Sequence, residues 1–374
     1  PSSLASAYRP RTSWLPLCAS NAATRRSIRE VCPVSPGVYG MVGVNRELIY
    51  VGESKSLRDR LLSYFTGTPA SAKVRRTVQE TKWLAWERTG HEFTALLREL
   101  ELIRRWQPRF NVLGNPGRSR RAYLCVGRGA AAHAYLSVKP SDRQGWTFGP
   151  VPANRSFRQS VRRLNDCFGL RDCRRSFETP FSDQLELFAQ RRDARCVRGT
   201  TGTCLAPCAT ACSQAEYRDR IGAAVDFLTG RDVAVLARVA EEMKSAACSR
   251  NYELAARLRA THEDLARLAT FFERLRQAHG YSFVSPARGQ TGGENWYLIQ
   301  EGQVAAVEQR PGNSPRSVRC RETLDAVVPR NRRGRPPAAP EDLDVVLLVS
   351  RWFREHPDEL KAVLSPAEAR RLCR

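Results

Sequence analysis

Residues 37–65 read GVYGMVGVNRELIYVGESKSLRDRLLSYF, and this stretch decides the fold of the first part of the chain. Its runs GVYGMV (37–42) and ELIYV (47–51) are short and rich in β-branched and aromatic residues, and GVNR joins them. This pattern predicts a β-hairpin. The segment SLRDRLLSYF that follows has apolar residues at helical spacing, so we expect a helix directly after the hairpin.

A second amphipathic helix is predicted at 92–106, EFTALLRELELIRRW. Its apolar residues fall on one face of a helix, and Pro108 ends the pattern. A hairpin followed by helices is typical of an α+β domain, and we expect a small mixed sheet flanked by helices.

Residues with polar or ionisable side chains lie along these elements: Tyr39, Tyr50, Arg60, Tyr64, Glu99 and Asn111. A phenol has an ordinary pKa near 10, so a catalytic tyrosine needs a nearby cation, and a guanidinium also binds phosphate. A glutamate is a hard oxygen ligand for Mg²⁺ or Mn²⁺. Taken singly, each residue has a structural interpretation. The tyrosines suit half-buried strands, Glu99 suits pairing with Arg98 or Arg104, and Asn111 suits a cap or turn.

In this order, the set resembles the GIY-YIG nuclease family, and EFTALLRELELIRRWQPRFNV is similar to the UvrC form of that family. The resemblance implies that Glu99 holds a single Mg²⁺ or Mn²⁺ ion. It also implies catalytic roles for Tyr39, Tyr50, Arg60, Tyr64 and Asn111. Which tyrosine is the general base stays open.

One position departs from the UvrC pattern. UvrC-type members carry a lysine directly after the glycine of the second motif, and this chain has Glu53 after Gly52. The change removes a cation and adds a carboxylate. It leaves open slower catalysis, or a Glu53 that reaches the metal or a water molecule.

The charge of the chain indicates a polyanionic partner. Lys and Arg number 61 against 38 Asp and Glu, a formal charge of +23. Nucleic acid is the partner that the charge favours, with an Arg-favouring composition as the alternative, and the resemblance to UvrC implies damaged double-stranded DNA. No apolar run is long enough for a membrane span, and the first thirty residues lack a secretory apolar region. We therefore expect no membrane partner and a cytoplasmic, nucleoid-associated bacterial protein.

Four of the twelve cysteines have ligand-like spacing: Cys173, Cys196, Cys204 and Cys208. In a reducing compartment such a cluster favours metal ligation over disulfides. Thiolates suit either Zn²⁺ or an iron–sulfur cluster, and spacing does not separate the two. The surrounding sequence resembles the cysteine region of UvrC, which implies a [4Fe–4S] cluster. Cys212 remains a spare or alternate ligand, and buried free cysteines are the remaining alternative.

Residues 233–277 predict an antiparallel helical hairpin with a break near 248–251. It resembles the UVR motif through which UvrC meets UvrB. The residues at the positions of that motif are Tyr252, Glu253, Ala255, Ala256 and Arg259. Ala260 stands where an acidic residue is common. The alternative is a hairpin that packs only on its own chain.

These patterns divide the chain into successive segments. We expect a flexible basic lead-in at 1–33, the nuclease domain at 34–114, and a UvrC-like strand and helix bridge at 115–170. The remaining segments are a cysteine-cluster region at 171–230, the UVR-type hairpin at 231–278, a small strand-rich region at 279–328, a linker at 329–340 and a C-terminal helical segment at 341–374.

The resemblance to UvrC runs from Pro36 to Leu268 and implies a DNA-repair endonuclease of nucleotide excision repair. It implies metal-dependent hydrolysis of a phosphodiester 3′ of a lesion, with recruitment by a UvrB-type helicase subunit. UvrC has a second nuclease half that depends on a carboxylate triad. No such triad follows residue 280 in this sequence, so a single cut is expected, as in the short UvrC homologue Cho. Two alternatives remain, namely a non-catalytic DNA- or UvrB-binding adaptor and a UvrB-independent, structure-specific GIY-YIG nuclease.

Overall fold

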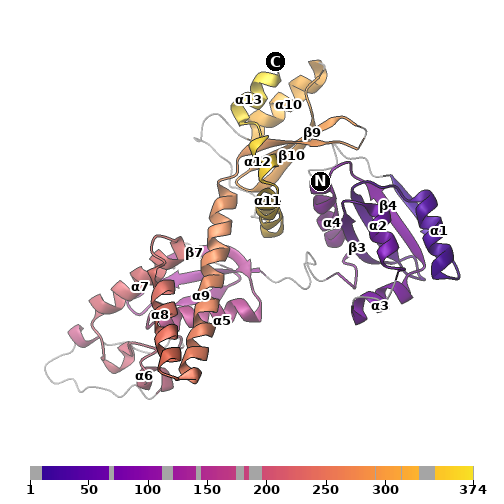
Figure 1. Ribbon diagram of the computed structural model, residues 1–374. Coiled ribbons are helices and arrows are strands. Elements are labelled where there is room, and N and C mark those ends of the chain that lie inside the picture. Colours follow the sequence, from indigo (N-terminus) through magenta and orange to yellow (C-terminus); the bar gives the residue numbers. More distant parts are fainter. Residues whose placement is uncertain are drawn as a thin grey trace. The chain divides into compact units, whose positions relative to one another are not determined.

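The computed structural model describes residues 11–66, 71–111, 121–139, 145–173, 181–184, 196–290, 292–312, 314–327 and 342–373. It divides into two compact units, which are described separately (Figure 1). The first unit combines residues 1–119 with residues 277–374, and the second holds residues 120–276. Segments from both ends of the chain therefore fold together. In the described ranges, no helix combines the length and the apolar character that crossing a membrane requires.

A four-stranded sheet with the order β1-β4-β2-β3 organises the N-terminal part of the first unit. Every pairing among these strands is antiparallel, so the expected mixed sheet is wrong. The reason is that β2 and β3 form a hairpin, and β4 returns beside β2 in the opposite direction. The strands are β1 (Thr12–Pro16), β2 (Gly37–Val42), β3 (Leu48–Ser54) and β4 (Trp83–Arg88).

Four helices accompany this sheet: α1 (Asn21–Val31), α2 (Leu57–Ser63), α3 (Ala72–Glu80) and α4 (Glu92–Trp106). Tyr39 and Met41 on β2 share a buried core with residues of α1 and α2. Helix α4 packs against β2 and β3. It begins at His91, whose ring nitrogen Nδ1 accepts a hydrogen bond from the Phe93 amide. It ends at Gln107, which is left-handed with a φ of 44°.

The flexible lead-in predicted for residues 1–33 is wrong from residue 11 onward, and residues 1–10 lie outside the described part. Strand β1 pairs with β4, and α1 is capped by Ser20. Ile28 and Cys32, one turn apart, are completely buried. The arginines on the outer side of α1 hid this short apolar stripe in the sequence.

The C-terminal module comprises the described residues of 281–373. Its sheet has the antiparallel order β10-β9-β8, and four helices follow. Helix α10 was not expected inside the strand-rich region, and the terminal segment holds three helices. The linker predicted at 329–340 lies outside the described residues. The elements are β8 (Phe283–Arg288), β9 (Glu294–Gln300), β10 (Gln303–Gln309), α10 (Ser314–Val327), α11 (Leu343–Glu355), α12 (Pro357–Lys361) and α13 (Pro366–Leu372).

Strand alternation gives the module two cores. Trp296 and Leu298 of β9 pack with residues of α10 and α13. Tyr297 and Ile299, which point the other way, pack with α11 and with α4 of the N-terminal part. Helix α4 is therefore covered by the sheet of the N-terminal part and by the C-terminal module. The two predicted segments at 279–328 and 341–374 thus form one compact body with the N-terminal domain.

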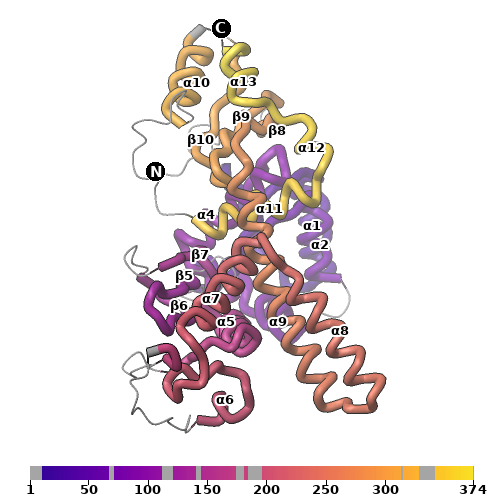
Figure 2. Tube along the Cα trace, turned by 90° about the vertical axis from the view of Figure 1, so that its left-hand side faces the viewer, coloured from indigo at the N-terminus to yellow at the C-terminus, as the bar shows by residue number. Residues whose placement is uncertain are grey.

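The second unit contains a three-stranded antiparallel sheet of order β6-β5-β7 with helices around it. Its long helices α8 and α9 form the expected hairpin, which both ribbon and tube views display (Figures 1 and 2). The last three residues of α9 belong to the first unit. The elements are β5 (Arg121–Gly127), β6 (Ala134–Ser137), β7 (Gly145–Pro152), α5 (Arg155–Cys167), η2 (Ser182–Gln184), α6 (Val197–Thr200), η3 (Pro207–Ala209), α7 (Gln214–Thr229), α8 (Ala234–Cys248) and α9 (Tyr252–His279).

Candidate active site

Three predicted site residues form one hydrogen-bonded group between β2 and α2. The Oη atoms of Tyr39 and Tyr64 lie 2.7 Å apart, and Arg60 Nε donates to Tyr39 Oη over 3.1 Å. The Arg60 guanidinium also lies 5.0 Å from the centre of the Tyr64 ring. Two neighbours therefore hold the Tyr39 phenol in place.

Gly52 on β3 makes this arrangement possible. It pairs with Tyr39 across the strands, and a Cβ at this position would lie 2.4 Å from Tyr39 Oη. Any other residue would displace the phenol. Tyr50 shares this face of the hairpin, with its ring centre 6.2 Å from that of Tyr39. The two motif tyrosines are thus adjacent.

Both tyrosines are neutral phenols at pH 7 in this arrangement. Burial, followed by the neighbouring phenols Tyr64 and Tyr50, raises the pKa of Tyr39 far above its usual value, although Arg60 opposes the shift. Burial, followed by Tyr64 and Glu99, raises the pKa of Tyr50 to about 12. The hydrogen bond from Arg60 favours the phenolate of Tyr39, but burial outweighs this single guanidinium.

Two carboxylates approach one another beside the tyrosines. Glu53 pairs with Val38 and points to the opposite face of the hairpin from Tyr39. The Glu99 carboxyl of α4 lies near the backbone of Glu53, whose N–H lowers the pKa of Glu99. Burial first, and then the charge of Glu53, raises the pKa of Glu99 to about 7. Glu99 also raises the pKa of Tyr50, so the carboxylates and tyrosines share one electrostatic environment.

The alternative partners considered for Glu99 are occupied elsewhere. Arg98 binds Glu87 and Glu101, with Nε 2.9 Å from a Glu87 oxygen. Arg104 binds aspartates that precede and begin α11. Glu99 is therefore not held at the site by a neighbouring arginine of its own helix.

The residues present fit a divalent cation. The Oε2 atom of Glu53 is buried and has no hydrogen-bond partner among the described residues. A second carboxylate, Glu99, adjoins it, and hard oxygen ligands suit Mg²⁺ or Mn²⁺. No group of three or more His, Cys, Asp or Glu residues is placed for metal binding in the described ranges, so the protein supplies two carboxylates at most here.

Asn111 holds the backbone of β3 in place next to Tyr50. Its Oδ1 accepts a hydrogen bond from the Val51 amide over 2.9 Å, and its Nδ2 donates to the Val51 carbonyl over 2.8 Å. Both side-chain groups are therefore engaged with the backbone next to Tyr50. This geometry favours a positioning role over direct contact with a substrate.

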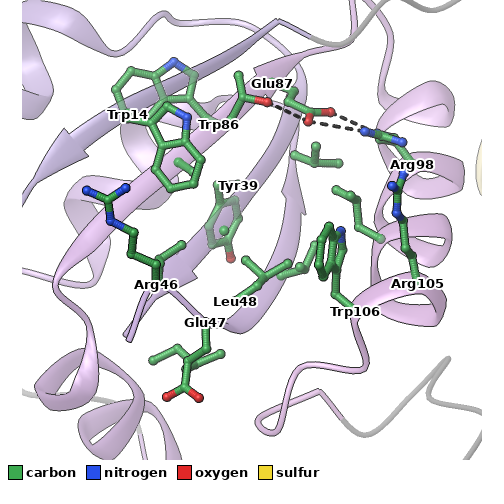
Figure 3. A pocket seen from close by; sticks show the side chains of 18 of the residues that line it. Trp14, Tyr39, Arg46, Glu47, Leu48, Trp86, Glu87, Arg98, Arg105 and Trp106 are labelled. Atoms are coloured by element: carbon green, nitrogen blue, oxygen red, sulfur yellow. Dashed lines mark hydrogen bonds and ion pairs between the residues drawn. The ribbon is translucent and has the colours of Figure 1, made fainter. Parts of the chain in front are cut away.

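A cavity of about 770 Å³ opens between the sheet and the C-terminal half of α4 (Figure 3). The buried Glu87–Arg98 pair lines one side of it. The exposed indoles of Trp14 and Trp106 also line it, together with Arg46, Arg105 and Arg109. Aromatic faces and guanidinium groups are the usual contacts for bases and phosphates.

The predicted cysteine ligands lie near one another in the second unit. Burial raises the pKa of Cys208, and the charges of Cys173 and Cys196 raise it further. Burial also raises the pKa of Cys204, and the charges of Cys208 and Cys173 add smaller increases. The described atoms nevertheless form no closed metal-binding group.

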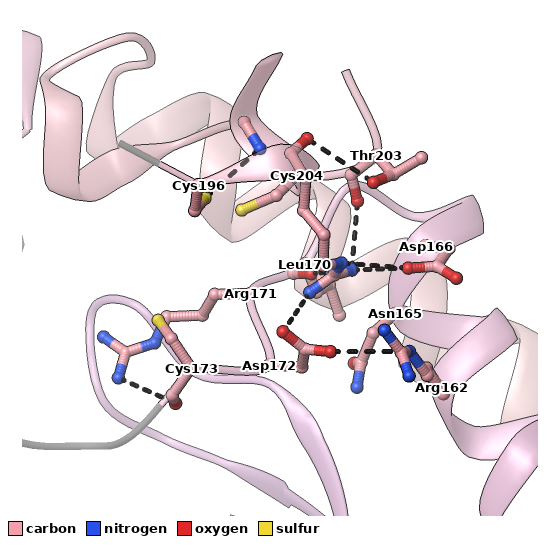
Figure 4. A network of polar contacts seen from close by, with 12 residues as sticks. Arg162, Asn165, Asp166, Leu170, Arg171, Asp172, Cys173, Cys196, Thr203 and Cys204 are labelled. Atoms are coloured by element: carbon pink, nitrogen blue, oxygen red, sulfur yellow. Dashed lines mark hydrogen bonds and ion pairs between the residues drawn. The ribbon is translucent and has the colours of Figure 1, made fainter. Parts of the chain in front are cut away.

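An arginine missed in the sequence organises this cysteine region. Arg198 donates to Asp166 and to the carbonyl oxygens of Leu170 and Thr203, and it pairs with Asp172 at 2.7 Å. Figure 4 shows Cys173, Cys196 and Cys204 around this network. Arg198 therefore connects, through its hydrogen bonds, the segments that carry the thiols. Nothing in the spacing of the sequence distinguished it from the many other arginines.

The predicted partner-binding residues cluster at the tip of the hairpin. The turn between α8 and α9 closes through the Asn251 amide, which donates to the Ala246 carbonyl. At the start of α9, Tyr252 is 70% exposed. Glu253, Ala256 and Arg259 are exposed as well, and Ala255 is half-buried. The hairpin thus leaves these side chains accessible.

The antiparallel hairpin, its two motif tyrosines, the arginine and tyrosine of α2 and the glutamate of α4 define a GIY-YIG-type nuclease domain. The UvrC-like GIY-YIG domain family matches residues 35–112, and the UvrC/Cho excinuclease middle domain matches residues 122–227. The chain therefore carries a UvrC-like GIY-YIG endonuclease domain followed by a UvrC/Cho excinuclease middle domain. This confirms the resemblance drawn from the sequence.

Individual proteins are similar to parts of this chain. UvrABC system protein C of Rhizobium meliloti is 33% identical over 225 residues, covering 60% of this chain and 32% of that protein. The Haemophilus ducreyi protein is 34% identical over 230 residues, covering 61% and 35%. The chain thus spans about a third of the length of these relatives. A solved structure of the GIY-YIG N-terminal endonuclease domain of Thermotoga maritima UvrC, bound to magnesium as its catalytic divalent cation, is 34% identical. The similarity covers 23% of this chain and 97% of that one, with a TM-score of 0.21.

Proposed function

We propose that this protein is a metal-dependent DNA endonuclease of nucleotide excision repair that hydrolyses a phosphodiester 3′ of a lesion. The observation that carries the proposal is the Tyr39–Arg60–Tyr64 group beside the paired carboxylates Glu53 and Glu99. Hydrolysis needs a route for the proton of the attacking water and stabilisation of charge on the phosphate. The two halves of the site supply one requirement each.

The residues of this chain have distinct parts in the reaction. Glu99 and Glu53 would hold Mg²⁺ or Mn²⁺, which when bound stabilises the charge that develops on the phosphate. Tyr39 is favoured as the group that relays the proton of water. Its Oη would accept that proton while its own hydroxyl proton passes to Tyr64 Oη, from which a proton leaves to solvent. The hydrogen bond from Arg60 would stabilise negative charge on Tyr39 Oη during the transfer. Tyr50 lies beside this pair, and Asn111 fixes the strand that carries it.

The binding of the cation is expected to depend on pH. The pKa of Glu99 is about 7 without a metal, because of burial and then Glu53. A proton therefore competes with the cation below this pH. The affinity for the cation should fall about tenfold for each unit by which the pH is lowered below 7, and it should be constant above pH 7. The measurement is a Mn²⁺ titration followed by electron paramagnetic resonance at several pH values. Equal affinity at pH 6 and pH 8 would contradict the assignment of Glu99 as a ligand.

Damaged double-stranded DNA is the substrate that the surface chemistry favours. The formal charge of +23 supplies sequence-independent affinity for phosphates. The Trp14 and Trp106 indoles at the cavity provide surfaces on which bases can stack.

A UvrB-type helicase subunit is the protein partner we propose, through the tip of the α8–α9 hairpin. Exposed tyrosines commonly anchor interfaces, and the small side chains of Ala255 and Ala256 permit close helix approach. Substitution Tyr252→Ala is expected to weaken UvrB binding roughly 30-fold, since anchor residues contribute about 2 kcal/mol or more. Surface plasmon resonance with immobilised UvrB measures this.

The control for this variant is Trp146→Ala, which removes another exposed aromatic residue of the second unit. It should leave UvrB binding within about twofold of the wild type. Cleavage that requires UvrB should fall in Tyr252→Ala, whereas UvrB-independent cleavage should not. Unchanged UvrB affinity in Tyr252→Ala would favour the UvrB-independent nuclease.

The decisive experiment is incision of a 5′-labelled duplex that carries one bulky adduct, with UvrB preloaded and Mg²⁺ present. A single cut on the 3′ side of the adduct is the expected result. Intact DNA binding without a cut, under either Mg²⁺ or Mn²⁺, would overturn the nuclease and favour the adaptor.

The cysteine region is proposed to hold a structural metal centre through Cys173, Cys196, Cys204 and Cys208. Their mutual proximity and the Arg198 network support this role, and a [4Fe–4S] cluster is favoured over Zn²⁺ by the resemblance. Anaerobically purified protein should contain iron and inorganic sulfide, as an iron–sulfur cluster held by cysteine thiolates requires. Zinc at one equivalent would establish the alternative, and neither metal would leave free thiols.

A further inference from the structure

Helix α11 of the C-terminal module lies along α4, the helix that carries Glu99. At one end, Arg104 binds Asp342, with Nη2 2.6 Å from Oδ1, and also reaches Asp344. At the other end, Trp352 packs against Phe93 and His91, with ring centres 5.5 Å and 5.7 Å apart. Since Arg104 is near the C-terminus of α4 and Phe93 near its start, the two helices are antiparallel.

This docking is built from several kinds of contact. Phe93, Leu96 and Leu97 share a buried core with Trp352 and Phe353. His91, the N-cap of α4, also lies 3.4 Å from Glu359, whose carboxylate accepts a hydrogen bond from the Trp352 indole. The position of α11 against the nuclease domain is therefore fixed at both ends and along the interface.

The register of the two helices brings Arg351 to the carboxylate side of the site. Arg351 directly precedes Trp352, so it lies level with the first half of α4. Its charge acts on both carboxyls, lowering the pKa of Glu53 and of Glu99 against the larger effect of burial. Its side chain is half-exposed, and Glu355 on its own helix lies 3.7 Å away, beyond hydrogen-bonding distance.

The charges of the neighbouring residues give Arg351 a chemical role. Glu53 places a second carboxylate beside Glu99. Arg60 donates through Nε to Tyr39 and is committed in part to that phenol. The charges of two carboxylates and of a divalent cation held by them cancel, so a guanidinium beside them would add the net attraction for a phosphodiester that the metal site alone does not supply.

We propose that Arg351 is a phosphate-binding residue of the nuclease site, contributed by the C-terminal module. A guanidinium donates two parallel hydrogen bonds to phosphate oxygens, and its position beside Glu53 and Glu99 suits the phosphate whose ester bond is cut. The inference rests on the proposed nuclease function and extends it, because the site becomes complete only when α11 is docked on α4.

The test compares three full-length variants: Arg351→Ala, Arg351→Lys and Arg354→Ala. Arg354 is a matched control, since it is a half-exposed arginine on the same helix that also neighbours Glu355. On the adducted duplex with UvrB and Mg²⁺, kcat/KM is expected to fall roughly 10- to 150-fold in Arg351→Ala, the effect of losing a charged hydrogen bond. Arg351→Lys should recover part of the loss, and Arg354→Ala should stay within about twofold of the wild type.

Two binding measurements separate phosphate binding from other roles. With Ca²⁺ in place of Mg²⁺, fluorescence anisotropy of a labelled duplex should give a salt dependence reduced by about one charge in Arg351→Ala relative to Arg354→Ala. Mn²⁺ affinity should be unchanged or higher in Arg351→Ala, because a positive charge has left the neighbourhood of the carboxylates.

The outcomes distinguish this inference from the proposed function. If the wild type does not cut, the nuclease proposal fails, while the salt dependence still decides whether Arg351 binds phosphate. Arg351→Ala and Arg354→Ala indistinguishable in cleavage and salt dependence would overturn the inference. Faster cleavage by Arg351→Ala would overturn it too, since α11 would then be an inhibitory cover.

Discussion

Substitution Glu99→Gln is expected to lower DNA cleavage about a thousandfold, because it removes one of the two carboxylates that can hold the cation. A bound cation contributes several kcal/mol of transition-state stabilisation, and about 4 kcal/mol corresponds to this factor. Mn²⁺ affinity should fall in parallel. Initial rates on the adducted duplex, with Mn²⁺ titrations on the same preparations, measure both effects.

The same substitution should not destabilise the protein. Burial and Glu53 raise the pKa of Glu99 above its ordinary value, so the folded state disfavours the ionised form. The sign follows from linkage. A carboxyl whose pKa is higher in the folded than in the unfolded state costs stability above its unfolded pKa, and this cost grows until pH 7 or so. A neutral glutamine removes the cost, so the variant should equal or exceed the wild type in free energy of unfolding at pH 8.

A matched control distinguishes loss of a ligand from loss of any carboxylate on α4. Glu101→Gln removes the carboxylate that binds Arg98 Nη1 over 2.9 Å, two residues away on the same helix. It should lose about 1 kcal/mol of stability or less and keep its cleavage rate. Equal cleavage rates for Glu99→Gln and the wild type would contradict the assignment of Glu99 as a metal ligand, whatever the free energies of unfolding.

The local elements of the active site were predictable because a pattern within a few consecutive residues indicates each of them. Alternation and turn residues indicated β2 and β3, and the apolar stripe with Pro108 indicated α4. Strand register then brings Tyr39 beside Tyr50, and helical spacing aligns Arg60 with Tyr64. These are consequences of periods of two and of about four residues.

Contacts between distant segments were not predictable in this way. Strand β1 has five residues and pairs with β4 far along the chain, so its sequence carries no pattern of its own. The docking of α11 on α4 joins Arg104 to Asp342 and brings Arg351 to Glu99. Neither ion pairing nor a shared core leaves a signal at fixed spacing. The raised pKa of Tyr39 depends on burial, which the motif also does not reveal.

Substitution Phe93→Ala is expected to lower the free energy of unfolding of the first unit by about 3–5 kcal/mol, as for other buried phenylalanines. Phe93 is 1% exposed and stands at the centre of the interface between α4 and the C-terminal module. Its ring centre lies 5.2 Å from Tyr297 in an edge-on arrangement, and Trp352 and Phe353 surround it. Chemical denaturation followed by tryptophan fluorescence measures the loss.

The control is Trp106→Ala on the same helix. Trp106 is 57% exposed, so removing its larger ring should cost about 0.5 kcal/mol or less. A loss below about 1 kcal/mol in Phe93→Ala would contradict the buried interface, because cavity formation at such a site costs more than that.

The regions in which Phe93→Ala accelerates hydrogen exchange show whether the C-terminal module and the nuclease domain unfold together. Phe93 belongs to α4, yet its main aromatic partners belong to β9 and α11. If the shared core makes one cooperative body, hydrogen exchange in Phe93→Ala should accelerate both in β2 and β3 and in β8 to β10. Acceleration confined to the C-terminal module would mean that it undocks alone. In that case cleavage by Phe93→Ala should fall no further than in Arg351→Ala, since undocking removes Arg351 and leaves Glu99 in place.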